Sequence, residues 1–169
     1  MTPHAVKKYL SYLFKAKNLH GVHSPFAYEL AEKVLNDKEI KKIPVELEPF
    51  NWLPPHYYAL LAKLAAHYNY KDIACLTQDN EEEPATYDLL LLRDTKPGDW
   101  LKLFNKYLPH IKNNSCMLVA GIHKTKHHSG RWKRLYRHPR VMMSVDLYGV
   151  GLLFFRKEFK EKQHFVLKY

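Results

Sequence analysis

The sequence predicts an α/β fold built on a mostly parallel sheet. Short apolar runs typical of buried strands alternate with amphipathic segments over the second half of the chain. The run Tyr87–Arg93 contains four consecutive leucines, as expected for a strand that is covered on both faces. With 169 residues, 46% of them hydrophobic, the chain has the size and composition of one domain. We therefore expect a single domain over 1–169, with a helical extension at 1–52 and the α/β core at 53–169.

Helical signals come first along the chain. Val6, Leu10 and Leu13 recur at the spacing of one helix face, and lysines lie between them. Ser24 and Pro25 are residue types favoured at an N-cap and at the first helical position. The expected N-terminal helices are 6–18, 24–37 and 54–68. Later helices are expected at 98–111 and 129–137.

Strand signals begin after the third helix. Six β segments are expected, at 72–77, 87–93, 115–122, 141–148, 150–156 and 164–168. Strands that are separated by helical segments imply right-handed crossovers and a parallel sheet. The last three β segments have no helix between them, so we expect antiparallel strands at the C-terminal edge. The final two are expected to form a hairpin through 157–163.

Positive charge is concentrated in the last third of the chain. Residues 101–169 hold 15 Lys or Arg and 3 Asp or Glu. Their net charge of +12 exceeds the net charge of +10 of the whole chain. On a helix starting near Ser129, Trp132 and Tyr136 share one face and the arginines lie on another. Such a stripe predicts contact with phosphate or nucleic acid, while an ordinary solvated helix face remains the alternative. The candidate polyanion-binding residues are Lys124, Lys126, Arg131, Lys133, Arg134 and Arg137.

Other site classes find little support. Cys75 and Cys116 lie in apolar runs, so we expect free core cysteines and no disulfide. His123 and His127 would share a face only on a helix, and no acidic residue is near them, so no metal site is expected. The N-terminus lacks the apolar core of a signal peptide, and no run of about 18 apolar residues occurs. We therefore expect a cytoplasmic protein without a membrane partner.

Two groups of motifs carry a resemblance. The first is His20-Gly21-Val22-His23-Ser24-Pro25-Phe26, and the second runs in order through Ile122-His123, Trp132, His138-Pro139-Arg140-Val141, Val145-Asp146-Leu147-Tyr148, Gly151–Arg156 and His164–Leu167. In these motifs the chain resembles a bacterial group of class I S-adenosylmethionine-dependent methyltransferases. The resemblance covers both ends of the chain well and the middle poorly. It implies a Rossmann-like, methyltransferase-like sheet that is truncated in this protein.

The departures from the family concern its cofactor site. The family has a glycine-rich loop after its first strand, but 77–83 reads TQDNEEE without a glycine. Strands that would follow are missing, and Ala120 and Gly121 replace an acidic pair. We therefore expect no cofactor, although S-adenosylmethionine is the ancestral one, and we assign no catalytic residue. The residual crevice would include Thr77, Asp94 and His123.

These observations favour a non-catalytic methyltransferase remnant that acts as a protein-interaction module, through a protein partner or self-association. Two alternatives stay open. One is an active S-adenosylmethionine-dependent methyltransferase with an altered pocket. The other is a basic protein that binds nucleic acid or another polyanion through 124–140. Asp146 lies in an alternating strand, where we expect it to face solvent.

Overall fold

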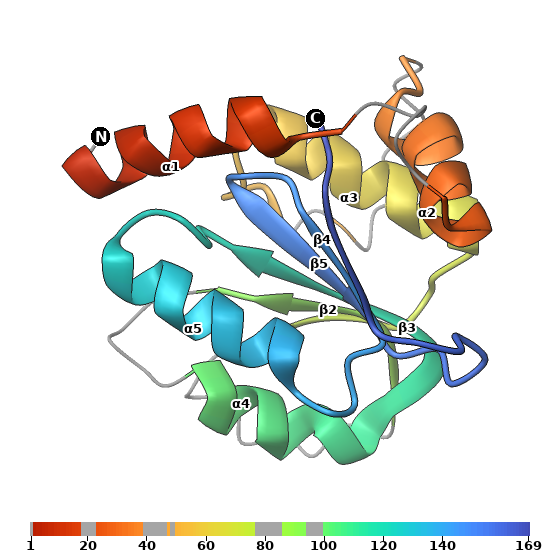
Figure 1. Cartoon of the computed structure of the whole chain (residues 1–169). Coiled ribbons are helices and arrows are strands. Elements are labelled where there is room, and N and C mark those ends of the chain that lie inside the picture. Colours follow the sequence, from red (N-terminus) through yellow and green to blue (C-terminus); the bar gives the residue numbers. More distant parts are fainter. Residues whose placement is uncertain (1, 18–22, 39–46, 48–49, 77–85, 94–99) are drawn as a thin grey trace.

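The computed structural model describes residues 2–17, 23–38, 47, 50–76, 86–93 and 100–169, and it has an α/β architecture (Figure 1). The helices are α1 (Pro3–Lys15), α2 (Pro25–Leu30), α3 (Pro55–Tyr68), α4 (Trp100–Tyr107) and α5 (Lys126–Arg137). A π-helical turn, Ala31–Leu35, continues α2, and a 3-10 turn, Leu108–His110, follows α4. The strands are β1 (Ile73–Leu76), β2 (Tyr87–Leu92), β3 (Ile111–Ala120), β4 (Met143–Asp146), β5 (Val150–Phe154) and β6 (Gln163–Val166).

Side-chain caps explain where two of the helices begin. The Ser24 hydroxyl accepts a hydrogen bond from the backbone N–H of Ala27, as the Ser-Pro signal predicted for α2. The Thr125 hydroxyl accepts one from the backbone N–H of His128 at 3.3 Å. This second cap starts α5 at Lys126, three residues before the start expected from the sequence.

The six strands form one mixed sheet in the order β1-β2-β3-β5-β4-β6. Adjacent strands are parallel from β1 to β3, β5 is antiparallel to both of its neighbours, and β6 is parallel to β4. Five strands therefore run in one direction, and their carboxyl ends meet at one edge of the sheet. This edge, here called the carboxyl edge, positions the site described below.

The expected antiparallel C-terminal edge and its hairpin are wrong. The only antiparallel strand in the described sheet is β5, which lies inside the sheet and forms its hairpin with β4. Every residue of β5 is buried, so the strand needs a neighbour on each side. The half-exposed β6 suits the edge position, where it pairs with β4 in parallel.

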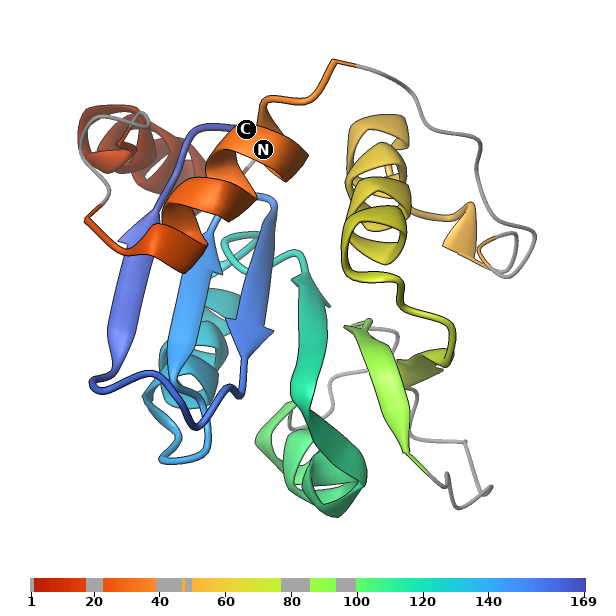
Figure 2. The same cartoon turned by 90° about the vertical axis from the view of Figure 1, so that its right-hand side faces the viewer.

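Two apolar layers cover the sheet on opposite faces. The leucines of β2 alternate between them: Leu89 and Leu91 pack with α2 and α3, whereas Leu90 and Leu92 pack with α4. All four leucines are fully buried, as the sequence predicted. Figure 2 shows α4 and α5 on one side of the sheet and the first helices on the other. The described residues thus form an α/β/α arrangement in three layers.

Helix α1 lies across the carboxyl edge and turns an unexpected face inward. Its buried side chains are Ala5 and Tyr12, whereas Val6, Leu10 and Leu13 are exposed. The Tyr12 hydroxyl donates a hydrogen bond to the carbonyl oxygen of Leu167 at 2.8 Å. A small residue and an anchored tyrosine therefore fix the helix, and the apolar stripe that the sequence placed on one face points to solvent.

Candidate functional site

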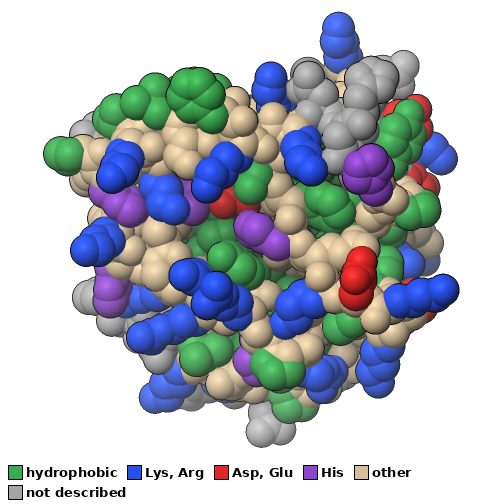
Figure 3. Space-filling model, in the orientation of Figure 1, with side chains coloured by type: hydrophobic (Ala, Val, Ile, Leu, Met, Phe, Trp, Pro, Cys, Tyr) green, Lys and Arg blue, Asp and Glu red, His purple; other side chains and the backbone are tan. Residues whose placement is uncertain are grey.

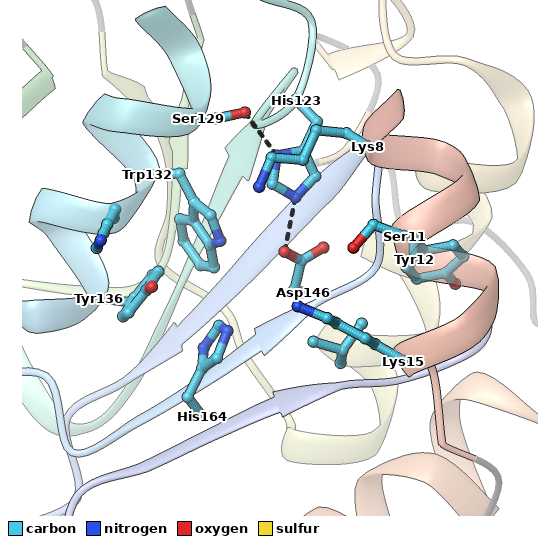
Figure 4. Close-up of a pocket in the computed structure, with 12 residues that line it drawn as sticks. Lys8, Ser11, Tyr12, Lys15, His123, Ser129, Trp132, Tyr136, Asp146 and His164 are labelled. Atoms are coloured by element: carbon cyan, nitrogen blue, oxygen red, sulfur yellow. Dashed lines mark hydrogen bonds and ion pairs between the residues drawn. The ribbon is translucent and has the colours of Figure 1, made fainter. Parts of the chain in front are cut away.

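A pocket of about 320 Å³ opens between α1 and α5 at the carboxyl edge of the sheet (Figure 4). It lies where β4 and β6 end and where the chain leaves β3. We call it the basic pocket because three lysines belong to its lining. The lining residues are Lys8, Ser11, Tyr12, Lys15, His123, Ser129, Trp132, Lys133, Tyr136, Asp146, His164 and Val166.

A buried histidine–aspartate pair forms the floor of the basic pocket. The His123 Nε2 atom lies 2.7 Å from Asp146 Oδ2, and each side chain is less than 10% exposed. The other carboxylate oxygen, Asp146 Oδ1, accepts a hydrogen bond from the backbone N–H of Tyr148 at 2.9 Å. The expectation that Asp146 faces solvent is therefore wrong. Its strand is covered on both faces, and an aspartate can be buried there because both oxygens have partners.

The pair continues into a chain of polar side chains that connects α1 with α5. The Ser129 Oγ atom lies 2.9 Å from His123 Nδ1 and 2.8 Å from His4 Nε2. Because a carboxylate only accepts, His123 donates from Nε2 to Asp146, and a neutral ring then accepts from Ser129 through Nδ1. The hydroxyl oxygen of Ser129 in turn accepts from His4. Partial burial and the nearby Lys8 charge lower the pKa of His4, which favours this neutral arrangement.

The order hydroxyl–imidazole–carboxylate is also that of a nucleophilic triad. Here the hydroxyl of Ser129 lies between two imidazoles that come from different elements. These contacts hold α1 against the start of α5, and the tyrosine that follows the aspartate adds another tie, since its hydroxyl donates to the Ala5 carbonyl oxygen at 2.9 Å. We interpret this series of hydrogen-bonded side chains as the structural frame of the pocket.

The rim of the basic pocket is positively charged. Lys8 and Lys15 come from α1, and Lys133 comes from α5 on the opposite side. Asp146 is the only acidic residue among the described residues of the lining, and both of its oxygens are already engaged. The lysine ammonium groups are therefore available for an anion that enters from outside.

Aromatic rings form the wall beneath α5. Trp132 is 2% exposed and lies flat against β5, because Gly151 has no side chain to separate them. Tyr136 stacks on His164, with ring centroids 4.2 Å apart. The Trp132 and Leu135 side chains are buried, as predicted for one face of this helix.

The opposite face of α5 carries the cationic residues that the sequence singled out. Lys126, Lys133, Arg134 and Arg137 are exposed, and Lys124 is exposed just before the helix. Arg131 is half-buried, with its guanidinium 5.9 Å from the centre of the Trp100 ring. Figure 3 shows Lys and Arg side chains along both sides of the hollow between α1 and α5. Through Lys133, this basic face is continuous with the basic pocket.

The residual crevice expected from the sequence is described only in part. Thr77 and Asp94 lie outside the described residues, so their placement stays untested. His123 is described, and its imidazole bonds toward β4 and α5. No group of three potential metal ligands occurs among the described residues. Cys75 and Cys116 are free, as expected.

Lys8, Lys15 and Ser129 are among the members of the site that sequence reasoning missed. The two lysines lie more than 100 residues before α5 in the sequence, so no local pattern connects them with it. Their seven-residue spacing does place them on one helix face, a signal that could have been noticed.

Comparison with known proteins gave no match for this chain, whether among protein-family models, curated proteins or solved structures.

Proposed function

We propose that this protein is a non-catalytic relative of class I methyltransferases that binds a phosphate-rich polyanion across the basic pocket and the exposed face of α5. The observation that carries the proposal is the convergence of Lys8 and Lys15 with Lys133 around one hollow. The proposal keeps the binding role expected from the sequence and replaces a protein partner with a polyanion.

The charge distribution supports an extended anion over an isolated one. Neither α1 nor α5 contains an acidic residue, so no neighbouring carboxylate on these helices neutralises their lysines and arginines. A nucleic acid presents evenly spaced phosphates, and each neutralised phosphate releases condensed counterions. A strand that follows α5 into the pocket would meet Arg137, Arg134 and Lys133 before it reaches the lysines of α1.

Methyltransferase ancestry rests on the motifs and on how they lie in space. Residues of two separate family-like segments meet at one place: His123 follows β3, whereas Asp146 ends β4 and Tyr148 lies two residues beyond it. The sheet, with parallel strands followed by an internal antiparallel strand, is compatible with a truncated Rossmann-like arrangement. These features support common descent and do not require the ancestral reaction.

The loss of methyl transfer is inferred from the sequence. A Rossmann-like site holds its cofactor with a glycine-rich turn and a ribose-binding carboxylate. This chain has no glycine at 77–83 and carries three adjacent glutamates there. We therefore propose that the protein functions without S-adenosylmethionine.

A salt series tests polyanion binding. Labelled single-stranded RNA and double-stranded DNA are titrated at several salt concentrations, and log K should fall linearly with log salt. Lys8→Gln and Lys133→Gln should each reduce the slope for RNA by about 0.7, the value for one lost phosphate contact on a single strand. Lys71→Gln is the matched control. Lys71 is exposed just before β1, so it lies at the amino ends of the parallel strands, away from the carboxyl edge that holds the basic pocket.

Two results would contradict the proposal. One is the absence of binding at low salt, and the other is an equal effect of all three substitutions. Loss of the methyl-transfer role is tested separately by calorimetric titration of S-adenosylmethionine. Micromolar binding of that cofactor would refute the non-catalytic part and leave the polyanion part to the salt series.

A further inference from the structure

Helix α1 exposes an apolar face that no described part of the chain covers. The described residues include seven exposed large hydrophobic side chains, and five of them are on this helix. Phe14 is the most exposed, at 90%. At helical spacing the five share one arc of the helix. They are Val6, Tyr9, Leu10, Leu13 and Phe14. Tyr9 forms the inner border of the arc and packs against the Tyr148 ring, with ring centroids 5.0 Å apart.

The helix cannot bury this arc by turning about its axis. Its inner face is fixed by Tyr12, whose hydroxyl donates to Leu167, and by Ala5, whose carbonyl oxygen accepts from the Tyr148 hydroxyl. At its N-terminus, the Thr2 hydroxyl donates to the carbonyl oxygen of Lys124 at 3.0 Å. The anchors hold the helix along its whole length, so the apolar arc stays outward.

Lysines border the arc on both sides. Lys7 follows the arc on the side of the basic pocket, and the helix contains no acidic residue. On the other side, Lys38 and Lys168 line the hollow between α1 and α3, together with one acid, Asp37. An apolar stripe bordered by cations is the pattern of helices that lie in the surface of an anionic membrane.

We infer that α1 is a membrane-surface helix that inserts its apolar arc into bilayers containing anionic lipid. A second copy of the chain is a poorer occupant, because two α1 helices packed through their arcs would bring Lys7 near lysines of the partner. A groove of another protein could not enclose the helix, since its inner face is held against the protein body. None of the described helices has both the length and the apolar character needed to span a bilayer.

The inference does not depend on the proposed polyanion site. It uses the outward arc of α1, whereas Lys8 and Lys15 point to the pocket on the inward side (Figure 4). It differs from the sequence-based expectation of no membrane partner, which rested on the lack of spanning segments and of a signal peptide.

Vesicle co-sedimentation of the full chain tests the inference. Vesicles of phosphatidylcholine alone are compared with vesicles that also contain phosphatidylserine, and binding should be stronger to the second. Leu10→Glu and Phe14→Glu should each weaken that binding at least about tenfold, because each removes a large apolar side chain from the lipid contact. Both positions are exposed, so neither substitution disturbs the core.

Tyr28→Glu is the matched control. Tyr28 is 40% exposed on α2, and its substitution makes the same change in charge outside the apolar arc. Insertion is read independently from Phe14→Trp, whose additional emission should shift to shorter wavelength when phosphatidylserine vesicles are added.

Three outcomes would overturn the inference. The first is no binding to either vesicle type. The second is equal weakening by Leu10→Glu, Phe14→Glu and Tyr28→Glu, which would show attraction by charge without insertion. The third is an absence of vesicle binding together with a dimer in light scattering that Phe14→Glu dissociates, which would assign the arc to self-association.

Discussion

The contact between Gly151 and Trp132 offers a sharp test of how the basic pocket is built. A Cβ atom added at Gly151 would lie 2.4 Å from Cη2 of Trp132 and 2.7 Å from two further ring carbons. Carbon atoms in optimal contact are about 3.5–4.0 Å apart, so the ring would have to retreat by about 1 Å. Trp132 is 2% exposed and lies between α5 and β5, where it has little room.

We expect Gly151→Ala to lower the free energy of unfolding by about 1–3 kcal/mol, the usual cost of overpacking a well-filled core. For a chain of this length, that corresponds to a fall in Tm of about 2–12 °C. The displaced ring would also move α5, and with it Lys133, away from the sheet. Polyanion binding should therefore weaken together with stability.

Gly130→Ala is the matched control, because it makes the same chemical change on α5. A Cβ atom at Gly130 has nothing within 4 Å. Alanine inside a helix is favoured over glycine by about 1 kcal/mol, so this variant should be more stable than the parent. Thermal unfolding followed by circular dichroism measures both variants. A Tm for Gly151→Ala equal to or above that of the parent would refute the close packing of Trp132 on β5.

Three further predictions concern buried polar groups. Asp146→Ala should reduce the free energy of unfolding by about 3 kcal/mol, because it leaves His123 and a backbone N–H without their acceptor. Urea unfolding measures this loss, and a loss below about 1 kcal/mol would contradict the buried pair. Burial alone would raise the pKa of Asp88, but hydrogen bonds from a lysine and two backbone N–H groups outweigh it and hold that pKa below its usual value. Asp88 therefore stabilises the folded state above about pH 4, and this stabilisation is lost as the pH falls through the lowered pKa. In Asp88→Asn the free energy of unfolding should fall less steeply with decreasing pH, and an unchanged pH profile would argue against the shift. Burial raises the pKa of the Cys116 thiol, which is fully buried, so iodoacetamide should label the half-buried Cys75 first. Mass spectrometry of digests distinguishes the two cysteines, and equal labelling in the native protein would be inconsistent with the fold.

Several elements were predictable because their signals are local. The four leucines of β2 require burial on both faces wherever the strand lies, and Ser24-Pro25 starts a helix through its own hydroxyl. The split of α5 into an aromatic face and a basic face likewise follows from helix periodicity alone. In each of these cases the residues that determine the structure lie close together in the sequence.

Tertiary structure decided the features that depend on competition between distant segments. β6 pairs with β4 because the buried β5 needs neighbours on both sides. The pattern of apolar and polar residues in β5 or β6 does not indicate which strand each of them pairs with. Asp146, at the end of β4, is buried because His123, from the turn after β3, supplies a partner for it. The inner face of α1 is set by the fit of Ala5 and Tyr12 to the end of the chain, and not by the more hydrophobic stripe. Sequence by itself therefore determined which segments are helices and strands, while long-range contacts determined which of their faces bind the core and which remain for a ligand.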